Sequence, residues 1–195
     1  MAVSAIFVML AVVCFVIVND SDSTEATGET SGSCGDNLTW TYDTETRALS
    51  ITGTGAMNNS YSDVKWGGNT IDSVSISDGA TSVGSYAFKG CTSLTSVTIP
   101  SSVTSIGLSA FEGCTSLTSV TIPSSVTSIG WMAFEGCTSL GTIVIPDSVT
   151  SIGIGTFTDC TSLVSVTIPD SVISIENHTF SGCSSLVSVT IPDSV

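Results

Sequence analysis

The stretch from Ala110 to Met132 reads AFEGCTSLTSVTIPSSVTSIGWM, and its pattern recurs along most of the chain. From about residue 74 onward, Phe, Cys, Leu, an Ile-Pro pair and Gly return at a constant interval of 23 residues. In the last copy, Glu176 stands where the earlier copies have Gly. Apolar residues at fixed offsets in such units are typical of a solenoid, in which each unit forms one coil and packs against its neighbours. The repeat therefore predicts a stack of similar coils.

Each unit alternates apolar and hydroxyl-bearing residues before its proline. Val97 and Ile99 are expected to point inward and the hydroxyl residues beside them outward, because alternate side chains of a strand lie on opposite faces. Pro100 ends the strand, since it has no N–H to donate. A second short extended segment follows, and then a tight or helical turn at 108–113. The expected fold is a mainly β solenoid of the leucine-rich-repeat type with short turns or helical turns, and about five coils fill residues 73–195.

The repeated Phe and Cys positions form the expected core columns. Disulfides between coils are disfavoured, because equivalent side chains in a parallel stack rarely present the required geometry. A zinc site is disfavoured as well, because ligands paired as C-x₂₋₄-C are absent. Cys behaves as a small buried hydrophobe, so the sequence favours thiols packed in the core. The columns are Phe88, Phe111, Phe134, Phe157 and Phe180, and Cys91, Cys114, Cys137, Cys160 and Cys183.

The outward positions of the first strand in each unit form a regular pair of columns. They carry almost no charge, and Val144 alone interrupts their run of hydroxyl groups. One interpretation is that Ser and Thr merely keep an exposed strand face soluble; the functional alternative is that this face binds a ligand. The candidate binding face comprises Ser96, Thr98, Ser119, Thr121, Thr142, Val144, Ser165, Thr167, Ser188 and Thr190.

These residues resemble the BspA-like leucine-rich-repeat surface proteins, which are found in bacteria and microbial eukaryotes. The carrying motif is the repeated AFxGCTSLTSVTIPSSVTSIG, which covers residues 74–195, or nearly two thirds of the chain. The stretch Ser33–Met57 also resembles the extension that often precedes the repeats in this family. The chain departs from the common leucine-rich consensus, since Ser102, Ser125 and Ser148 hold the place of the usual Asn ladder. The resemblance implies a non-catalytic protein that binds extracellular partners.

Residues 34–72 are expected to form an N-terminal β cap. Two alternating segments, Leu38–Tyr42 and Ala48–Thr52, predict a hairpin with a slightly long loop. Such a hairpin would cover the apolar end and the open sheet edge of the first coil. The region 58–69 is mostly polar and predicts a surface loop pinned by Trp66.

The two ends of the chain carry expectations about export and completeness. Residues 1–18 contain no charged side chain, so we assign 1–20 to a signal peptide or a membrane anchor, with a buried soluble helix as the remaining alternative. Residues 21–33 form an acidic spacer. Contact with a membrane is expected only through residues 1–18, if they are retained. The last unit stops midway, at Val195, which suggests a fragment or an end that pairs with another chain.

Charge and the scarcity of reactive side chains exclude several classes of function. With 3 basic against 17 acidic residues and a formal charge of −14, the chain lacks the clustered Lys and Arg that nucleic-acid binding requires. His178 is the only histidine, and no special Ser and acid accompany it in a catalytic pattern. The column of Asp147, Asp170 and Asp193 is a poor calcium cage. We therefore expect no enzyme and no cofactor.

Three classes of function remain in competition, and an enzyme is the least favoured of them. The sequence favours a secreted or cell-surface binding protein, used for adhesion or protein–protein interaction through an extended repeat surface. The alternative is a structural surface-layer or ice-binding solenoid, since the Ser/Thr face is loosely similar to the Thr arrays of ice-binding solenoids. Trp131 and Met132, in a variable turn, are the best single candidates for an unusual apolar surface patch, although packing over the neighbouring turn is an equal alternative.

Overall fold

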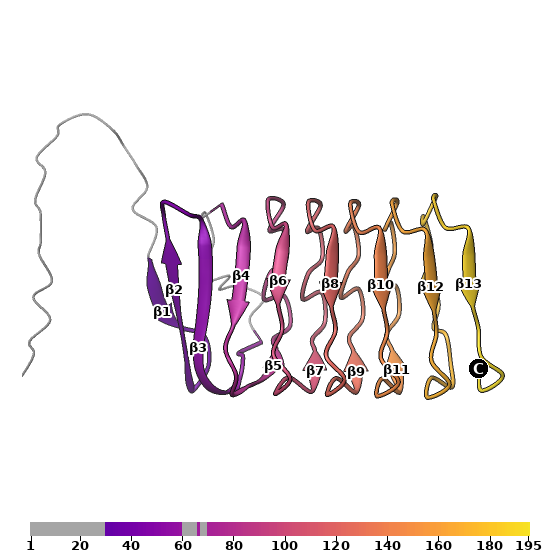
Figure 1. The fold of residues 1–195 in the computed structure, drawn as a ribbon, viewed down its shortest axis with the longest axis horizontal. Helices are drawn as coiled ribbons and strands as arrows, with labels where there is room; N and C mark the ends of the chain where they lie inside the picture. The colour runs from indigo at the N-terminus through magenta and orange to yellow at the C-terminus, as the bar shows by residue number, and fades with distance from the viewer. Residues whose placement is uncertain (1–29, 60–65, 67–69) are drawn as a thin grey trace, which may run out of the picture.

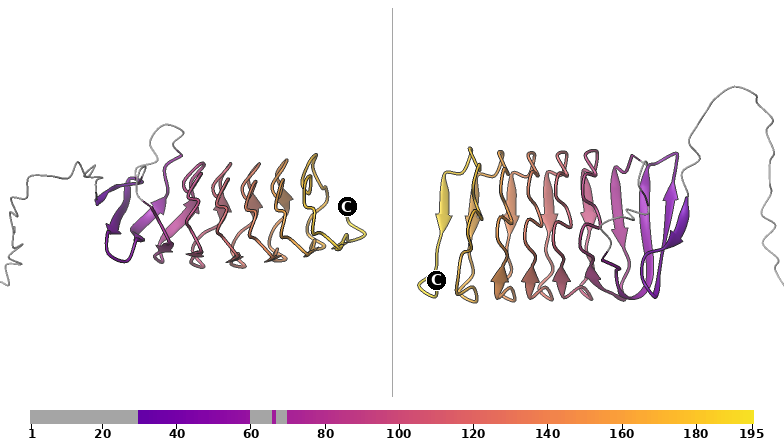
Figure 2. Two further views of the ribbon diagram at one scale, coloured as in Figure 1. Left: turned by 90° about the horizontal axis from the view of Figure 1, so that it is seen from above. Right: turned by 180° about the vertical axis from the view of Figure 1, so that it is seen from behind.

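The computed structural model describes residues 30–59, 66 and 70–195. These residues form a β-solenoid whose coils stand side by side in a nearly straight row, with the cap at one end and Val195 at the other (Figures 1 and 2). No helix occurs within the described ranges, so the segment 108–113 is the tight, hydrogen-bonded turn of the two alternatives rather than a helical one. The solenoid has about six turns, one more than the sequence predicted. The additional turn is the first, where the repeat has diverged too far to read.

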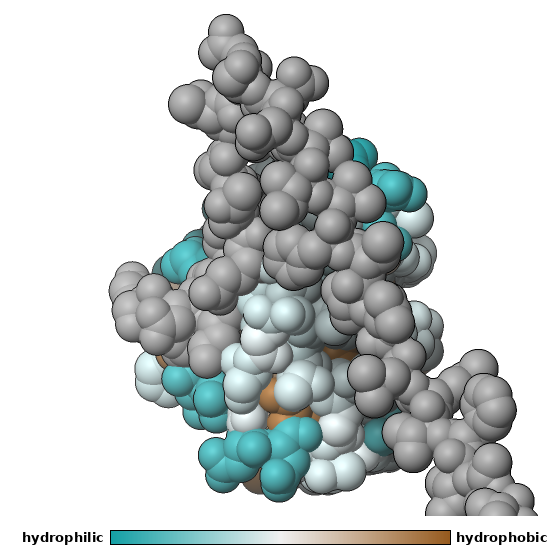
Figure 3. All heavy atoms as spheres, turned by 90° about the vertical axis from the view of Figure 1, so that its left-hand side faces the viewer, coloured by the Kyte–Doolittle hydropathy of each residue, from teal (hydrophilic) through white to brown (hydrophobic). Residues whose placement is uncertain are grey.

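The predicted hairpin is confirmed at the N-terminal end. Strand β2 (Asn37–Asp43) pairs antiparallel with β3 (Ala48–Ala56), and Trp40 lies opposite Ile51. Strand β1 (Ser31–Ser33) adds to the outer edge of β2, so ordered structure begins inside the segment that the sequence assigned to the spacer. Figure 3 views this end, and the described surface there is mostly neutral or polar with a small apolar area.

Two parallel ladders run along the solenoid, and β3 begins both of them. Its first half pairs with β4, and its end pairs with β5. The front ladder continues from β4 to β6, which lies beside β8, and then through β10, β12 and β13. The front strands are β4 (Ser73–Ile76), β6 (Ser96–Thr98), β8 (Ser119–Thr121), β10 (Thr142–Val144), β12 (Ser165–Thr167) and β13 (Ser188–Thr190). The second ladder comprises β5 (Ala80–Val83), β7 (Ser105–Ile106), β9 (Ser128–Ile129) and β11 (Ser151–Ile152).

The Phe column forms one continuous aromatic stack through the core. Its ring centroids lie 5.2 to 5.8 Å apart from Phe88 to Phe180, with interplanar angles of 6 to 18°. Trp66 extends the stack toward the cap, 5.4 Å from Phe88, and meets Trp40 edge-on at 5.9 Å. Trp66 precedes Phe88 by 22 residues rather than 23, which explains why the exact period misses it. The aromatic stack thus joins the cap to every coil.

The Cys column consists of thiols, and no disulfide joins them within the described residues. From Cys114 onward, each sulfhydryl donates to the carbonyl oxygen of a Phe in the preceding coil, with S···O distances of 3.0 to 3.2 Å. Burial raises the pKa of Cys91 and Cys137 to about 12 and also raises that of Cys114 and Cys160. A thiol reacts as its thiolate, so these side chains are inert packing groups.

A serine ladder replaces the Asn ladder of other leucine-rich repeats. Each serine hydroxyl donates to a backbone carbonyl oxygen 22 residues earlier, and the O···O distances are 2.6 to 2.9 Å. Ser102 also accepts a hydrogen bond from the Gly79 N–H at 3.1 Å. These bonds satisfy carbonyl groups that would otherwise be left unpaired between coils. The members of the ladder are Ser102, Ser125, Ser148, Ser171 and Ser194.

The glycine column, Gly84, Gly107, Gly130 and Gly153, sets how closely the coils approach one another after the second strand. A Cβ added to Gly130 would lie 2.6 Å from the backbone of Gly107 and Leu108. Glu176 occupies this column in the last coil, and the residues before it form no strand against β11. Ile173, at the outward position where earlier coils carry Thr104, Thr127 and Thr150, is 74% exposed. The second ladder therefore ends one coil before the front ladder does.

Candidate binding face

The structure brings all ten residues of the candidate binding face together on the outer side of the front ladder. Every one of them is exposed, while the apolar residues between them point into the core. Their columns are in register: Ser119 pairs with Thr142, and Thr142 with Ser165. Thr167 pairs with Thr190 in the same way. We call this surface the hydroxyl face.

The hydroxyl face continues into the cap, which sequence reasoning missed. Ser75 pairs with Thr98 on one side and with Ser50 on the other, so one column crosses from β6 through β4 to β3. On the hairpin, Thr39 and Thr52 pair, and their hydroxyl oxygens lie 3.1 Å apart. The alternation of Thr and Ser between the buried residues of the hairpin was the available signal. The cap and the coils thus share one outer face.

The hydroxyl face becomes more apolar toward the C-terminal coils. Val144 is 77% exposed within the face, beside Thr121. Val164 and Val187 stand one residue before β12 and β13, and they are 48% and 85% exposed. At the same offset, earlier coils carry Thr95 and Thr118. A partner that covers these coils would therefore bury apolar surface as well as hydroxyl groups.

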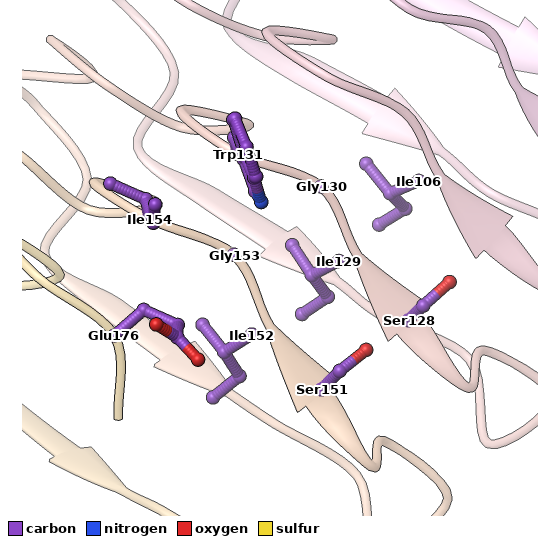
Figure 4. Close-up of a pocket in the computed structure, with 10 residues that line it drawn as sticks. All are labelled: Ile106, Ser128, Ile129, Gly130, Trp131, Ser151, Ile152, Gly153, Ile154 and Glu176. Carbon is purple, nitrogen blue, oxygen red and sulfur yellow. The ribbon is translucent and has the colours of Figure 1, made fainter. Parts of the chain in front are cut away.

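A separate groove lies beside the second ladder, around the residues that the sequence marked as an unusual apolar patch. Its volume is about 400 Å³, and Figure 4 shows the side chains that line it. Trp131 is 55% exposed, so its ring is available to a ligand. Met132 is half-buried and does not line the groove. The lining residues are Ile106, Ser128, Ile129, Gly130, Trp131, Ser151, Ile152, Gly153, Ile154 and Glu176, which we call the Trp131 groove.

The remaining polar candidates stay apart from one another. His178 is exposed, with a left-handed φ of 62°, at a turn position where Ser109, Met132 and Gly155 also have positive φ. Within residues 30–59, 66 and 70–195, no three His, Cys, Asp or Glu side chains could hold a metal ion together. The Asp column, including Asp170, is exposed on the turns that follow the prolines.

Glu135 gives the turn surface a pH dependence. Partial burial raises the pKa of its carboxyl group, and the nearby charges of Glu112 and Asp159 raise it further, against the opposing effect of Lys89. The stabilising, protonated form is therefore fully present below the ordinary carboxyl pKa and is lost as the pH rises through the raised value. Glu135→Gln should increase Tm at pH 7 and leave it nearly unchanged at pH 3, as measured by thermal unfolding. An equal increase at both pH values would contradict this assignment.

The repeats match a family model. The model describes a BspA-type leucine-rich repeat region, and six copies match residues 66–187. The chain belongs to the BspA-type leucine-rich repeat family. The six copies agree with the six turns of the structure, and the first copy begins at Trp66, at the start of the aromatic stack.

Two solved structures of leucine-rich repeat proteins are similar to this BspA-type chain. The T. pallidum leucine-rich repeat protein is 27% identical, the match covers 79% of each chain, and the TM-score is 0.66. A leucine-rich repeat protein from Bacteroides ovatus is 31% identical, with a TM-score of 0.64. That match covers 80% of this chain but only 46% of the Bacteroides chain. No curated protein matches the sequence.

The expectation about the N-terminal segment falls outside the described structure. Within the described ranges, no helix is long and apolar enough to cross a membrane. The apolar run at 1–18, which the sequence assigned to a signal peptide or an anchor, precedes those ranges.

Proposed function

We propose that this protein is a non-catalytic, secreted or cell-surface binding protein whose hydroxyl face docks on an extracellular protein. The proposal rests on the exposure and the register of the hydroxyl face. Its ten outward residues lie in columns across five strands, and the columns continue into the cap. Leucine-rich-repeat solenoids are generally binding scaffolds, and extended repeat surfaces suit large partners. Membership of the BspA-type family supports the same role.

The chemistry of the hydroxyl face suits a polar protein surface. Hydroxyl groups both donate and accept hydrogen bonds, so they can meet either kind of backbone or side-chain group. They carry no charge that would have to be desolvated. Exposed Val144 adds an apolar contact within the face. The uncharged apolar run at residues 1–18 supports export of the chain to the cell surface or the medium.

Binding to a panel of immobilised extracellular-matrix proteins and to cultured cells tests this function. The full chain should bind at least one member saturably, and the heat-denatured chain should not. The large negative charge predicts that added salt changes the association rate more than it changes the complex lifetime. Absence of saturable binding to every member would contradict the proposal.

A second candidate is ice binding, which the straightness of the row favours (Figure 2). Neighbouring hydroxyl columns lie in register, as an array that orders water would require, although Val144 interrupts it. Thermal hysteresis of the purified chain tests this alternative. A measurable depression of the freezing point, lost on replacement of Thr121 by Arg, would favour ice binding over protein binding.

A further inference from the structure

Two residues that break the repeat pattern, Trp131 and Glu176, border the Trp131 groove. The Trp131 ring lies over Gly153, and a Cβ on Gly153 would come within 2.5 Å of the ring carbon Cδ1. Glu176 follows Gly153 in the same column, one coil further along, and lines the groove with Trp131 (Figure 4). The ring and the carboxylate therefore border one groove, although 45 residues separate them in the sequence.

The carboxylate of Glu176 has unused capacity to accept hydrogen bonds. Its Oε1 accepts one hydrogen bond, from the Ser174 hydroxyl at 3.2 Å. Among the residues that the structure describes, no cation pairs with Glu176: Arg47 pairs with Asp72, and Lys89 pairs with Glu112. A carboxylate accepts several hydrogen bonds and binds a guanidinium group in a two-pronged arrangement.

The exposed indole ring of Trp131 is the second group, beside the Glu176 carboxylate, that could bind a cation. An indole ring attracts a cation over its face, and arginine is the commonest partner because its planar group also stacks. Ser128 and Ser151 border the opposite side of the groove with hydroxyl groups (Figure 4), where they can accept hydrogen bonds from other donors of the partner. The net charge of −14 draws basic partners toward the chain.

We propose that the Trp131 groove binds an arginine side chain of a basic partner protein, with the guanidinium stacked on Trp131 and hydrogen-bonded to Glu176. This inference rests on the proposed binding function and adds a specificity site on the second ladder. The groove would select partners that present arginine at the second ladder. A sugar ring, which also stacks on exposed indoles, is the competing occupant that the test distinguishes.

The test follows the indole N–H resonance of Trp131 in the full, isotope-labelled chain, assigned by its loss in Trp131→Ala. The probe is the blocked tripeptide acetyl-Gly-Arg-Gly-amide. Its matched neutral form has citrulline in place of arginine, and maltose serves as the sugar probe. The arginine peptide should shift the resonance saturably, and the citrulline peptide should bind about 5-fold more weakly or worse. Equal shifts by both peptides, or tighter binding of maltose, would overturn the proposal.

Two charge-matched variants separate the groove from general electrostatics. Glu176→Gln should weaken binding of the arginine peptide about 2- to 5-fold, as expected for an exposed ion pair. Asp147→Asn removes the same charge from a turn outside the groove and should change binding less than 1.5-fold, roughly the limit of such titrations. Equal effects of the two variants would contradict the site. If the arginine peptide fails to bind while the chain still binds its matrix partner, this inference falls and the proposed function stands.

Discussion

Phe134→Ala is expected to lower the free energy of unfolding by about 3–5 kcal/mol, the usual cost of deleting a fully buried aromatic ring. The Phe134 side chain is 0% exposed and stacks between Phe111 at 5.3 Å and Phe157 at 5.8 Å. Removing it leaves a cavity in the middle of the aromatic stack and interrupts the contact between neighbouring coils. Denaturant unfolding of the full chain, followed by circular dichroism, measures the change.

The same substitution at the end of the stack is the matched control. Phe180 is only partly buried and, among the described residues, stacks on Phe157 alone, so Phe180→Ala should lower the free energy of unfolding clearly less. In a solenoid each coil is stabilised by its neighbours. Phe134→Ala weakens the contact between the two halves of the solenoid, so the halves should unfold in two separate transitions. Equal losses at both positions would contradict a stack whose stability is shared along the row.

Gly130→Ala is the second substitution with a large expected effect, and it should lower the free energy of unfolding by about 2–3 kcal/mol. The backbone of Gly130 is not in the left-handed region, so conformational strain does not enter. The added Cβ would meet the backbone of Gly107 and Leu108 at 2.6 Å. Because both contacts are backbone, the coils must move apart and the β7–β9 pairing must weaken. Denaturant unfolding again supplies the measurement.

Gly141→Ala is the control for Gly130→Ala, because a Cβ at Gly141 has no atom within 4 Å and the backbone again lies outside the left-handed region. It should leave stability unchanged or raise it by up to about 1 kcal/mol, since alanine restricts the unfolded chain. Similar losses for the two variants would show that the close approach of the coils is not what requires glycine at position 130.

Much of the fold could be predicted from the sequence, because the 23-residue period repeats the same local pattern in every coil. The inward Phe and Cys columns, the strand before each proline and the hairpin were all predictable in this way. The first coil was missed because Trp66 and Ile71 replace the repeated Phe and Leu, and because Trp66 is out of step by one residue. The hydrogen bonds of the serine ladder could not be predicted either, because the sequence does not show which backbone carbonyl group each serine hydroxyl contacts.

The candidate site was predictable only in part. The hydroxyl face follows from strand alternation, but its extension over β3 and β4 depends on the turn of β3 from one ladder to the other. The Trp131 groove could not be predicted from the sequence. It depends on the packing of the Trp131 side chain against Gly153 of the next coil, in a groove that Glu176 also lines. The replacement of Gly by Glu at position 176 was visible, yet its consequence for the second ladder emerges only from the packing of the coils.

The most direct test of the hydroxyl face compares two pairs of substitutions in the full chain. Thr121→Gln with Thr167→Gln enlarges two exposed positions of the hydroxyl face. Ser101→Gln with Ser124→Gln makes a similar change at two exposed turn positions outside it. The measurement is the dissociation constant for the matrix protein that the chain binds. We expect a loss of affinity of about 10-fold or more for the first pair, or roughly 1.4 kcal/mol, and no change for the second. Equal affinities for both pairs would contradict the assignment of the hydroxyl face as the binding surface.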